Sequence, residues 1–149
     1  MQQEEQALAP RSPALTQLHN DWERRRHGRL MPARADFDPI DLKYVLGNLT
    51  MVDVLRDPLR FRIRLHASNV ANRVGFDLTG KELDAITDPH YRKLVHDHYI
   101  AVVERRRPVL EFRDRVMTDN VCLHCEVLAL PLADDGVTVD RIMSAFVWC

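Results

Sequence analysis

The sequence contains few cysteines and no long hydrophobic run. Three cysteines among 149 residues, an odd number, do not suggest a disulfide framework. No apolar stretch approaches the roughly 18 residues that a membrane-spanning helix needs. The N-terminus, MQQEEQALAPRSP, lacks the basic start and the apolar centre of a signal peptide. These absences predict a cytoplasmic protein that does not enter a membrane.

The sequence also has no large excess of positive or of negative residues. The 21 lysines and arginines are offset by 22 acidic residues, which leaves a formal net charge of -1 and gives no reason to expect nucleic acid as the main ligand. The two basic runs, Arg24–Arg26 and Arg105–Arg107, stand at predicted helix C-termini. Solvated cations are favoured there by the helix dipole, so a phosphate site is the weaker interpretation. No glycine-rich phosphate loop, HExxH motif or Ser-His-Asp arrangement is present, which makes an enzyme the less favoured class.

The chain is long enough for one domain with its own core. Residues 1–14 are predicted to be flexible. Apolar residues at helical spacing predict a helix from Leu15 that stops at Gly28, and after an extended linker Asp38 caps a short helix over 39–46.

Strands follow. Residues 49–55 and 61–65 form a predicted hairpin with Phe61, Ile63 and Leu65 on its buried face, and 66–88 contain short helical pieces. Asp88-Pro89 opens a longer helix that ends near Arg106. The remaining strands are predicted at 109–118, 121–132 and 140–148. This order predicts an α+β domain: an antiparallel sheet with helices on one face.

Four stretches, PARADFDPIDL, LRFRIRL, VGFDLTGKEL and LPLADDGVTVDRIM, together with the element order, resemble the small stand-alone PAS-domain family of bacteria. The similarity covers roughly residues 15–148. It implies a PAS fold, with a five-stranded antiparallel sheet, helices on one face and an additional N-terminal helix. Residues 15–48 would then form an N-terminal helical extension, and 49–149 the PAS core domain.

The resemblance implies a function as well as a fold. PAS domains sense small ligands or partners and relay signals, and the family supplies no catalytic residues to transfer. We therefore expect a non-enzymatic sensory or regulatory module in bacterial signal transduction, whose output comes from an unidentified signalling protein. The identity of any ligand or cofactor stays open, because one fold hosts many. The residues predicted to line the ligand pocket are Phe61, Ile63, Leu65, Val70, Val74, His98, Phe112, Phe146 and Trp148.

The stretch VCLHCEV (121–127) suggests thiol or metal chemistry. In a strand, Cys122 and Cys125 point to opposite faces with Cα atoms about 10 Å apart, beyond the ~7 Å that a disulfide tolerates. Cys122 and His124 share a face, and pairing of the last two strands brings Cys149 nearly opposite Cys122. Three such ligands suit zinc or copper(I). Cysteines that simply fill sheet positions are the favoured alternative, so no metal is predicted.

Histidines on the long helix offer a second candidate site. His98 lies in the apolar stripe and His96 on the polar side. A neutral imidazole in an apolar pocket is able to bind haem iron, whereas a histidine hydrogen-bonded in the core or buried in a dimer contact is the more usual case. A haem- or metal-binding sensor is thus the rival hypothesis, followed by a small enzyme. Light-sensing PAS domains carry a cysteine in the region of short helices, but residues 66–88 contain none, so a flavin is not indicated.

Self-association is the best supported interaction. Leu15, Leu18 and Trp22 form one stripe of the first helix, and a helix this short has to dock on something. It would cover the open face of its own sheet or pair with a second copy. We predict a homodimer through these three residues.

Overall fold

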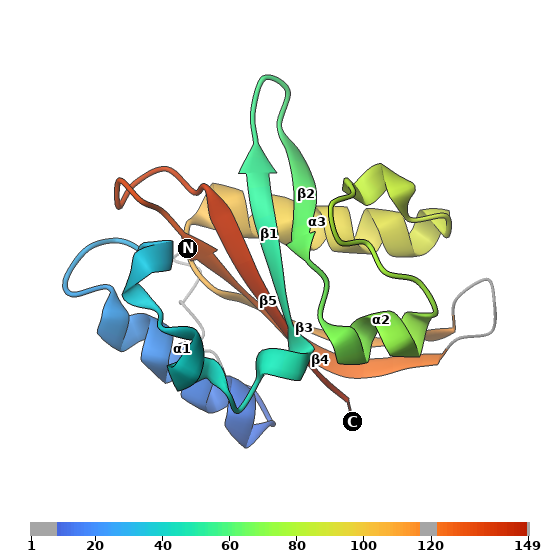
Figure 1. Ribbon diagram of the computed structural model, residues 1–149, viewed down its shortest axis with the longest axis horizontal. Helices are drawn as coiled ribbons and strands as arrows, with labels where there is room; N and C mark the ends of the chain where they lie inside the picture. Colours follow the sequence, from blue (N-terminus) through green and yellow to red (C-terminus); the bar gives the residue numbers. More distant parts are fainter. Residues whose placement is uncertain (1–8, 117–121, 149) are drawn as a thin grey trace, which may run out of the picture.

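The computed structural model describes residues 9–116 and 122–148. Five antiparallel strands form one sheet with the order β2-β1-β5-β4-β3, as Figure 1 shows. The strands are β1 (Leu49–Leu55), β2 (Arg60–Leu65), β3 (Val109–Val116), β4 (Cys122–Leu132) and β5 (Arg141–Trp148). This confirms the predicted α+β fold with a five-stranded antiparallel sheet and an N-terminal helix.

Three α-helices and four short 3-10 helices complete the described part of the chain. They are α1 (Pro13–Arg25), η1 (Arg34–Asp36), η2 (Pro39–Leu42), η3 (Leu46–Asn48), α2 (Ser68–Val74), η4 (Leu83–Ala85) and α3 (Pro89–Arg105). The helix predicted over 39–46 is reduced to η2 and η3.

Helix α3 begins and ends where its local signals predict. The Asp88 side chain accepts hydrogen bonds from the backbone N–H groups of His90 and Tyr91, and Pro89 occupies the first turn. At the other end Arg106 adopts a left-handed conformation (φ 54°) and donates its N–H to the Val102 carbonyl. The cap and the C-terminal turn therefore fix a seventeen-residue helix before the chain enters β3.

The two faces of the sheet carry different helices. Arg113 in β3 pairs with Cys125 in β4, and these positions face α3. The adjacent pair, Phe112 and Glu126, faces the opposite way, because successive strand residues alternate between faces. Helix α1 packs on that second face, against β4 and β5. We call the side that faces α3 the inner face, and the side that faces α1 the outer face (Figure 1).

Helix α1 docks on its own sheet. Leu15, Leu18 and Trp22 are buried, and Trp22 Nε1–H donates to the Pro131 carbonyl of β4 at 2.8 Å. Full burial of each such side chain contributes about 1.5–3 kcal/mol. Of the two partners considered for this helix, the structure shows the chain's own sheet. A homodimer stays a prediction, but in this arrangement these three side chains are not available to a second copy.

Two face assignments made from alternation were wrong. Leu65 is 56 % exposed, because the register between β1 and β2 shifts at Met51/Val52, so that Leu65 pairs with Met51 on the outer face. Phe112 is 46 % exposed and pairs with Glu126, which places it on the outer face too. In both strands the register to the neighbouring strand decides the face, and alternation alone leaves it undetermined.

Candidate functional site

Three ionisable side chains meet between α3 and β3. His98 comes from the buried stripe of α3, and Glu111 and Arg113 lie two residues apart on the inner face of β3. His98 is 0 % exposed and Arg113 only 2 %. We call these three residues the interior polar cluster. Most ionisable groups are found at the surface, so a buried cluster of this kind is a candidate functional site.

The hydrogen bonds around His98 define its tautomer. Its Nε2 lies 2.8 Å from the Val109 carbonyl oxygen, which only accepts, so Nε2 carries a proton and donates it. Its Nδ1 lies 2.9 Å from Nη2 of Arg113, which only donates. Both contacts are satisfied when Nδ1 is unprotonated, and His98 is therefore neutral.

The pKa values of the cluster agree with this assignment. Burial, and after it the positive charge of Arg113, lower the pKa of His98 to about 3. Burial raises the pKa of Glu111, although the charge of Arg113 acts in the opposite direction. Glu111 Oε1 lies 3.2 Å from Nδ1 of His98 and 3.5 Å from Nε of Arg113, so the carboxyl group contacts both partners.

The guanidinium of Arg113 is incompletely paired. Its contacts to Glu111 Oε1, from Nε and from Nη2, are both long at 3.5 Å. Among the described residues, neither Nε nor Nη1 has a hydrogen-bond partner. The rings of Tyr91 and Phe146 lie near the cation, with centroids 6.0 and 5.5 Å from Cζ. These cation–π contacts compensate only part of the desolvation cost of a buried charge.

Further buried polar groups surround the cluster. Tyr91 and Tyr99 of α3 are both buried, and burial raises the pKa of Tyr91 to about 12, so its hydroxyl stays protonated. Ser144 of β5 is also buried on the inner face, where its hydroxyl lies near that of Tyr99 without a close hydrogen bond among the described residues. The inner face thus offers several donors to a ligand around one cation.

Comparison with known proteins identifies the family. A family model described as PAS domain matches residues 10–147. The chain belongs to the PAS domain family. The PAS domain of BvgS from Bordetella pertussis has the same fold, with a TM-score of 0.53, 18% identity, and coverage of 69% of this chain and 77% of that chain. No curated protein matches.

Family membership sets the general role. PAS domains typically act as sensory and signalling modules and are usually non-catalytic. In the described ranges of this PAS domain, no helix has the length and apolar character that would let it cross a membrane.

The residues predicted to line a pocket in this PAS domain fall into two groups. Leu65 and Phe112 are on the outer face, as described above. The others are buried or partly buried on the inner side of the fold: Phe61, Ile63, Val70, Val74, His98, Phe146 and Trp148. Whether these residues bind a ligand stays a prediction.

Sequence reasoning missed Glu111 and Arg113. The segment VLEFRDRV alternates apolar and polar residues, and Phe112 was predicted to line the pocket, a placement that leaves no inward position for its charged neighbours. The observed register instead turns the charged pair inward. The buried His98 on the facing helix was the only local sign that a polar group would be needed opposite it.

Haem binding does not fit the arrangement of His98. An axial ligand requires a ring nitrogen that is available to iron, yet Nε2 and Nδ1 are both hydrogen-bonded. The alternative, a histidine hydrogen-bonded in the core, is confirmed. His96 is exposed on the polar side of α3.

The proposed metal ligands are only partly described. Cys149 and the side chain of Cys122 lie outside the described residues. His124 is about half exposed, with Nδ1 3.2 Å from Asp114 Oδ1, and Cys125 is buried. Within the described part of the chain, no group of three or more His, Cys, Asp or Glu side chains is arranged to hold a metal ion. That β4 includes both cysteines confirms the strand geometry used to separate them.

Proposed function

We propose that this PAS domain is a non-enzymatic sensory or regulatory module of bacterial signal transduction. It responds to a small molecule bound at the interior polar cluster and passes the response to a signalling protein through surface contacts. The proposal places the protein in the cytoplasm and includes self-association as a homodimer.

The incompletely paired Arg113 carries this proposal. A buried cation without a full set of partners costs stability, and such groups persist in proteins mainly where they have a role. Arg113 belongs to the sheet and its partner His98 to α3, so a molecule that binds here contacts both layers. Its binding would change how tightly α3 is held against β3.

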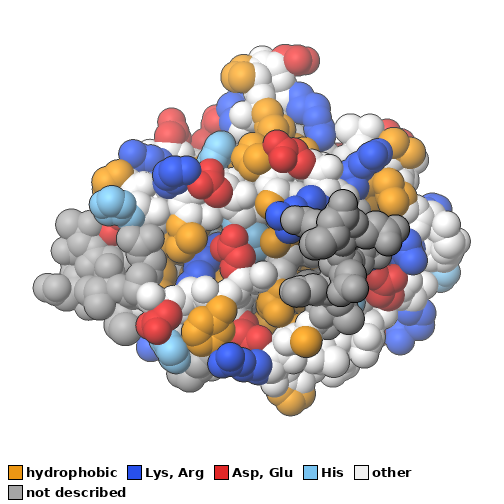
Figure 2. Space-filling model, turned by 180° about the vertical axis from the view of Figure 1, so that it is seen from behind, with side chains coloured by type: hydrophobic (Ala, Val, Ile, Leu, Met, Phe, Trp, Pro, Cys, Tyr) orange, Lys and Arg blue, Asp and Glu red, His pale blue; other side chains and the backbone are white. Residues whose placement is uncertain are grey.

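A route to the surface follows from the register of β4. Cys125, the strand partner of Arg113, is followed by Glu126, whose carboxylate binds the start of α1 on the outer face. A shift of β3 and β4 at the cluster would therefore act on α1. Figure 2 shows one face of the domain, over which apolar, basic and acidic side chains are interspersed.

The homodimer requires a contact other than the stripe of α1. Exposed apolar side chains on the β1–β2 hairpin, Leu59 and Leu65, offer one such surface. Light scattering of the full chain at micromolar concentration tests this part of the proposal. A monomer mass across the concentration range would remove it.

Native mass spectrometry of the purified chain tests the ligand. We expect a bound small molecule that is lost on denaturation, or, after screening of a metabolite library, a compound that slows amide exchange in both α3 and β3. The double substitution His98→Leu/Arg113→Met, which removes two of the three polar side chains of the cluster, should abolish the slowing of amide exchange by the compound. A chain that binds no compound and shows no change in exchange would contradict the proposal.

A further inference from the structure

We propose that the interior polar cluster binds the carboxylate of a small monocarboxylic acid, with Nη1 of Arg113 as the principal donor. This inference rests on the proposed function, because it names the class of ligand for the same site. It is carried by the donors, the charge and the apolar neighbours of the arginine, which are taken in turn below.

The donors of Arg113 are divided between two edges of the guanidinium. Covalent geometry places Nε–H and Nη2 on one edge, and this edge faces Glu111 through its two 3.5 Å contacts. Nη2 also donates to His98. Nη1 lies off that edge, carries two N–H groups and has no hydrogen-bond partner among the described residues. A carboxylate matches the guanidinium fork better than any neutral acceptor, because the hydrogen bonds are charge-assisted.

The charge of Arg113 is balanced within the cluster only by the long ion pair with Glu111. His98 is held neutral by its hydrogen bonds to Val109 and Arg113. Glu111 is the nearest acidic group, but it is partly exposed and makes only long contacts to the guanidinium. A monoanion balances the arginine, whereas a dianion would bring a second charge into the interior without a partner. A monocarboxylate therefore fits better than a dicarboxylate or a phosphate.

The remainder of the ligand is expected to be apolar. The rings of Tyr91 and Phe146 lie beside the guanidinium, and Val127 and Ala129 are fully buried in β4. Beyond the carboxylate, polar atoms of a ligand would meet these groups without hydrogen-bond partners. Short aliphatic or aromatic acids are thus the chemical class that the site accepts.

Butyrate and butyramide test the inference as a matched pair, since they are similar in shape and differ in charge. Calorimetry and thermal unfolding should show saturable binding of butyrate with a Kd on the order of 1 mM, as so few ligand atoms allow. Butyramide should bind at least about ten-fold more weakly, because it lacks the charge-assisted bonds. Sodium chloride at equal ionic strength should give no comparable stabilisation.

A variant pair assigns the effect to Arg113. Arg113→Gln should lose at least about ten-fold in butyrate affinity, and Arg64→Gln, which removes an exposed arginine from β2, should leave it unchanged. Should Arg113→Gln fail to fold, the ¹⁵Nε–H resonance of Arg113 in the unchanged protein supplies the readout. It should shift with butyrate and not with butyramide.

Each other outcome overturns the inference. Equal binding of the acid and the amide, an effect reproduced by chloride, or an affinity that survives in folded Arg113→Gln would each exclude a carboxylate site at this arginine. If a neutral compound from the metabolite library binds between α3 and β3 while butyrate and benzoate do not, the proposed function stands and only the carboxylate assignment fails. If nothing binds in the interior, both fail.

Discussion

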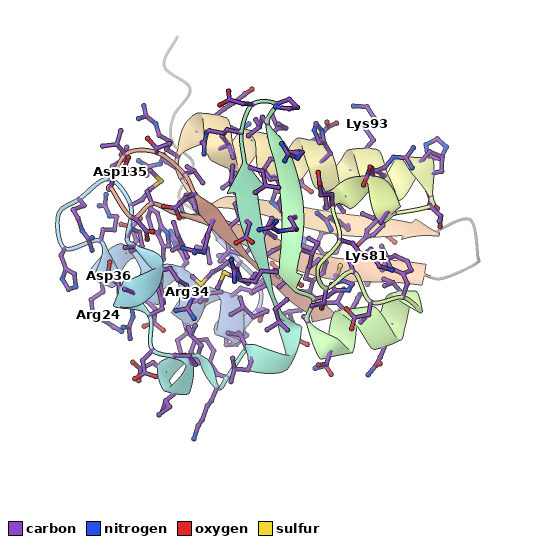
Figure 3. The ribbon with its side chains drawn as sticks, turned by 45° about the horizontal axis from the view of Figure 1, so that its top comes forward. Arg24, Arg34, Asp36, Lys81, Lys93 and Asp135 are labelled. Carbon is purple, nitrogen blue, oxygen red and sulfur yellow. The ribbon has the colours of Figure 1, made fainter. Side chains whose placement is uncertain are left out.

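Arg113 in β3 donates a hydrogen bond from Nη2 to Nδ1 of His98 in α3, at 2.9 Å, and both side chains are buried. The bond joins the sheet to the long helix across the interior of the domain. The bond also depends on the protonation state of His98, because Nδ1 accepts from the arginine only while the imidazole is neutral. By contrast Lys93, on the solvent side of the same helix, points away from the sheet and pairs with Asp97 (Figure 3).

Folding stability should decrease as the pH is lowered, because burial and the charge of Arg113 oppose protonation of His98 in the folded protein. The unfolded chain takes up a proton on His98 near pH 6.5, whereas the folded protein resists it to about pH 3. Protonation therefore favours the unfolded state, at up to about 1.4 kcal/mol per pH unit, between these two values. Urea unfolding at several pH values should show the difference between the wild type and His98→Gln shrinking as the pH falls through this window.

Val95→Ala is the control for the pH experiment. Val95 is buried on the same face of α3, and its replacement removes no ionisable group. Its difference from the wild type should be constant over the same pH range. A constant difference for His98→Gln as well would show that His98 does not resist protonation in the folded protein.

Glu126 holds the start of α1 on the outer face. Its two carboxylate oxygens accept hydrogen bonds from the backbone N–H groups of Arg11 and Ser12, at 2.7 and 2.8 Å. Glu126→Gln replaces one acceptor by a donor, so we expect a loss of about 1–3 kcal/mol in the free energy of unfolding. Amide exchange at the start of α1 should accelerate before that of β4.

The same substitution at Glu23 provides a comparison. Glu23 is partly exposed in α1 and pairs with Arg26. Because exposed ion pairs contribute about 0–1 kcal/mol, Glu23→Gln should have little effect on unfolding or on exchange. Similar effects at the two sites would contradict the specific role of Glu126.

Asp53 lies within ion-pair distance of three arginines on the outer face of the sheet. It accepts hydrogen bonds from Arg62 and Arg64 at 3.1 and 3.0 Å, and Arg141 lies 3.6 Å away. Burial alone would raise its pKa, but the arginines overcome this and lower it. Asp53→Asn should destabilise the domain by about 1–3 kcal/mol. Asp97→Asn, which removes an exposed pair with Lys93, should have little effect in thermal or urea unfolding.

The face assignments in β2 and β3 are testable with two phenylalanines. Phe61 is buried on the inner face, and Phe61→Ala should cost about 3–5 kcal/mol. Phe112 is partly exposed and contacts the guanidinium of Arg11, so Phe112→Ala should cost about 1 kcal/mol or less. If Phe112→Ala were the more damaging of the two in urea unfolding, the register of β3 described above would be incorrect.

Much of the fold could be predicted because its signals are local. Each end of α3 is set by a few neighbouring residues: Asp88-Pro89 at its start and the turn after Arg105 at its end. The strand β1 was predicted with its observed bounds, and β4 and β5 within one residue of theirs. Alternation of apolar and polar residues and the turn residues between strands are sufficient for such assignments.

The candidate site was predicted less well, because it depends on contacts between distant segments. Phe112 and Arg113 are neighbours in the chain, and only the pairing of β3 with β4 decides which of them faces α3. Leu65 was misplaced for the same reason, through the register shift beside Met51. A shift by one residue reverses every side chain of a strand.

The sequence by itself determined the elements, their order and the family, since caps, turns and periodicity act over a few residues. The tertiary structure decided which charged residues are buried together. His98 is visible in the sequence as a histidine in an apolar stripe, but its partners Arg113 and Val109 are set by the packing of α3 on the sheet. Burial then gives the cluster its properties, because desolvation keeps the histidine neutral beside the buried arginine.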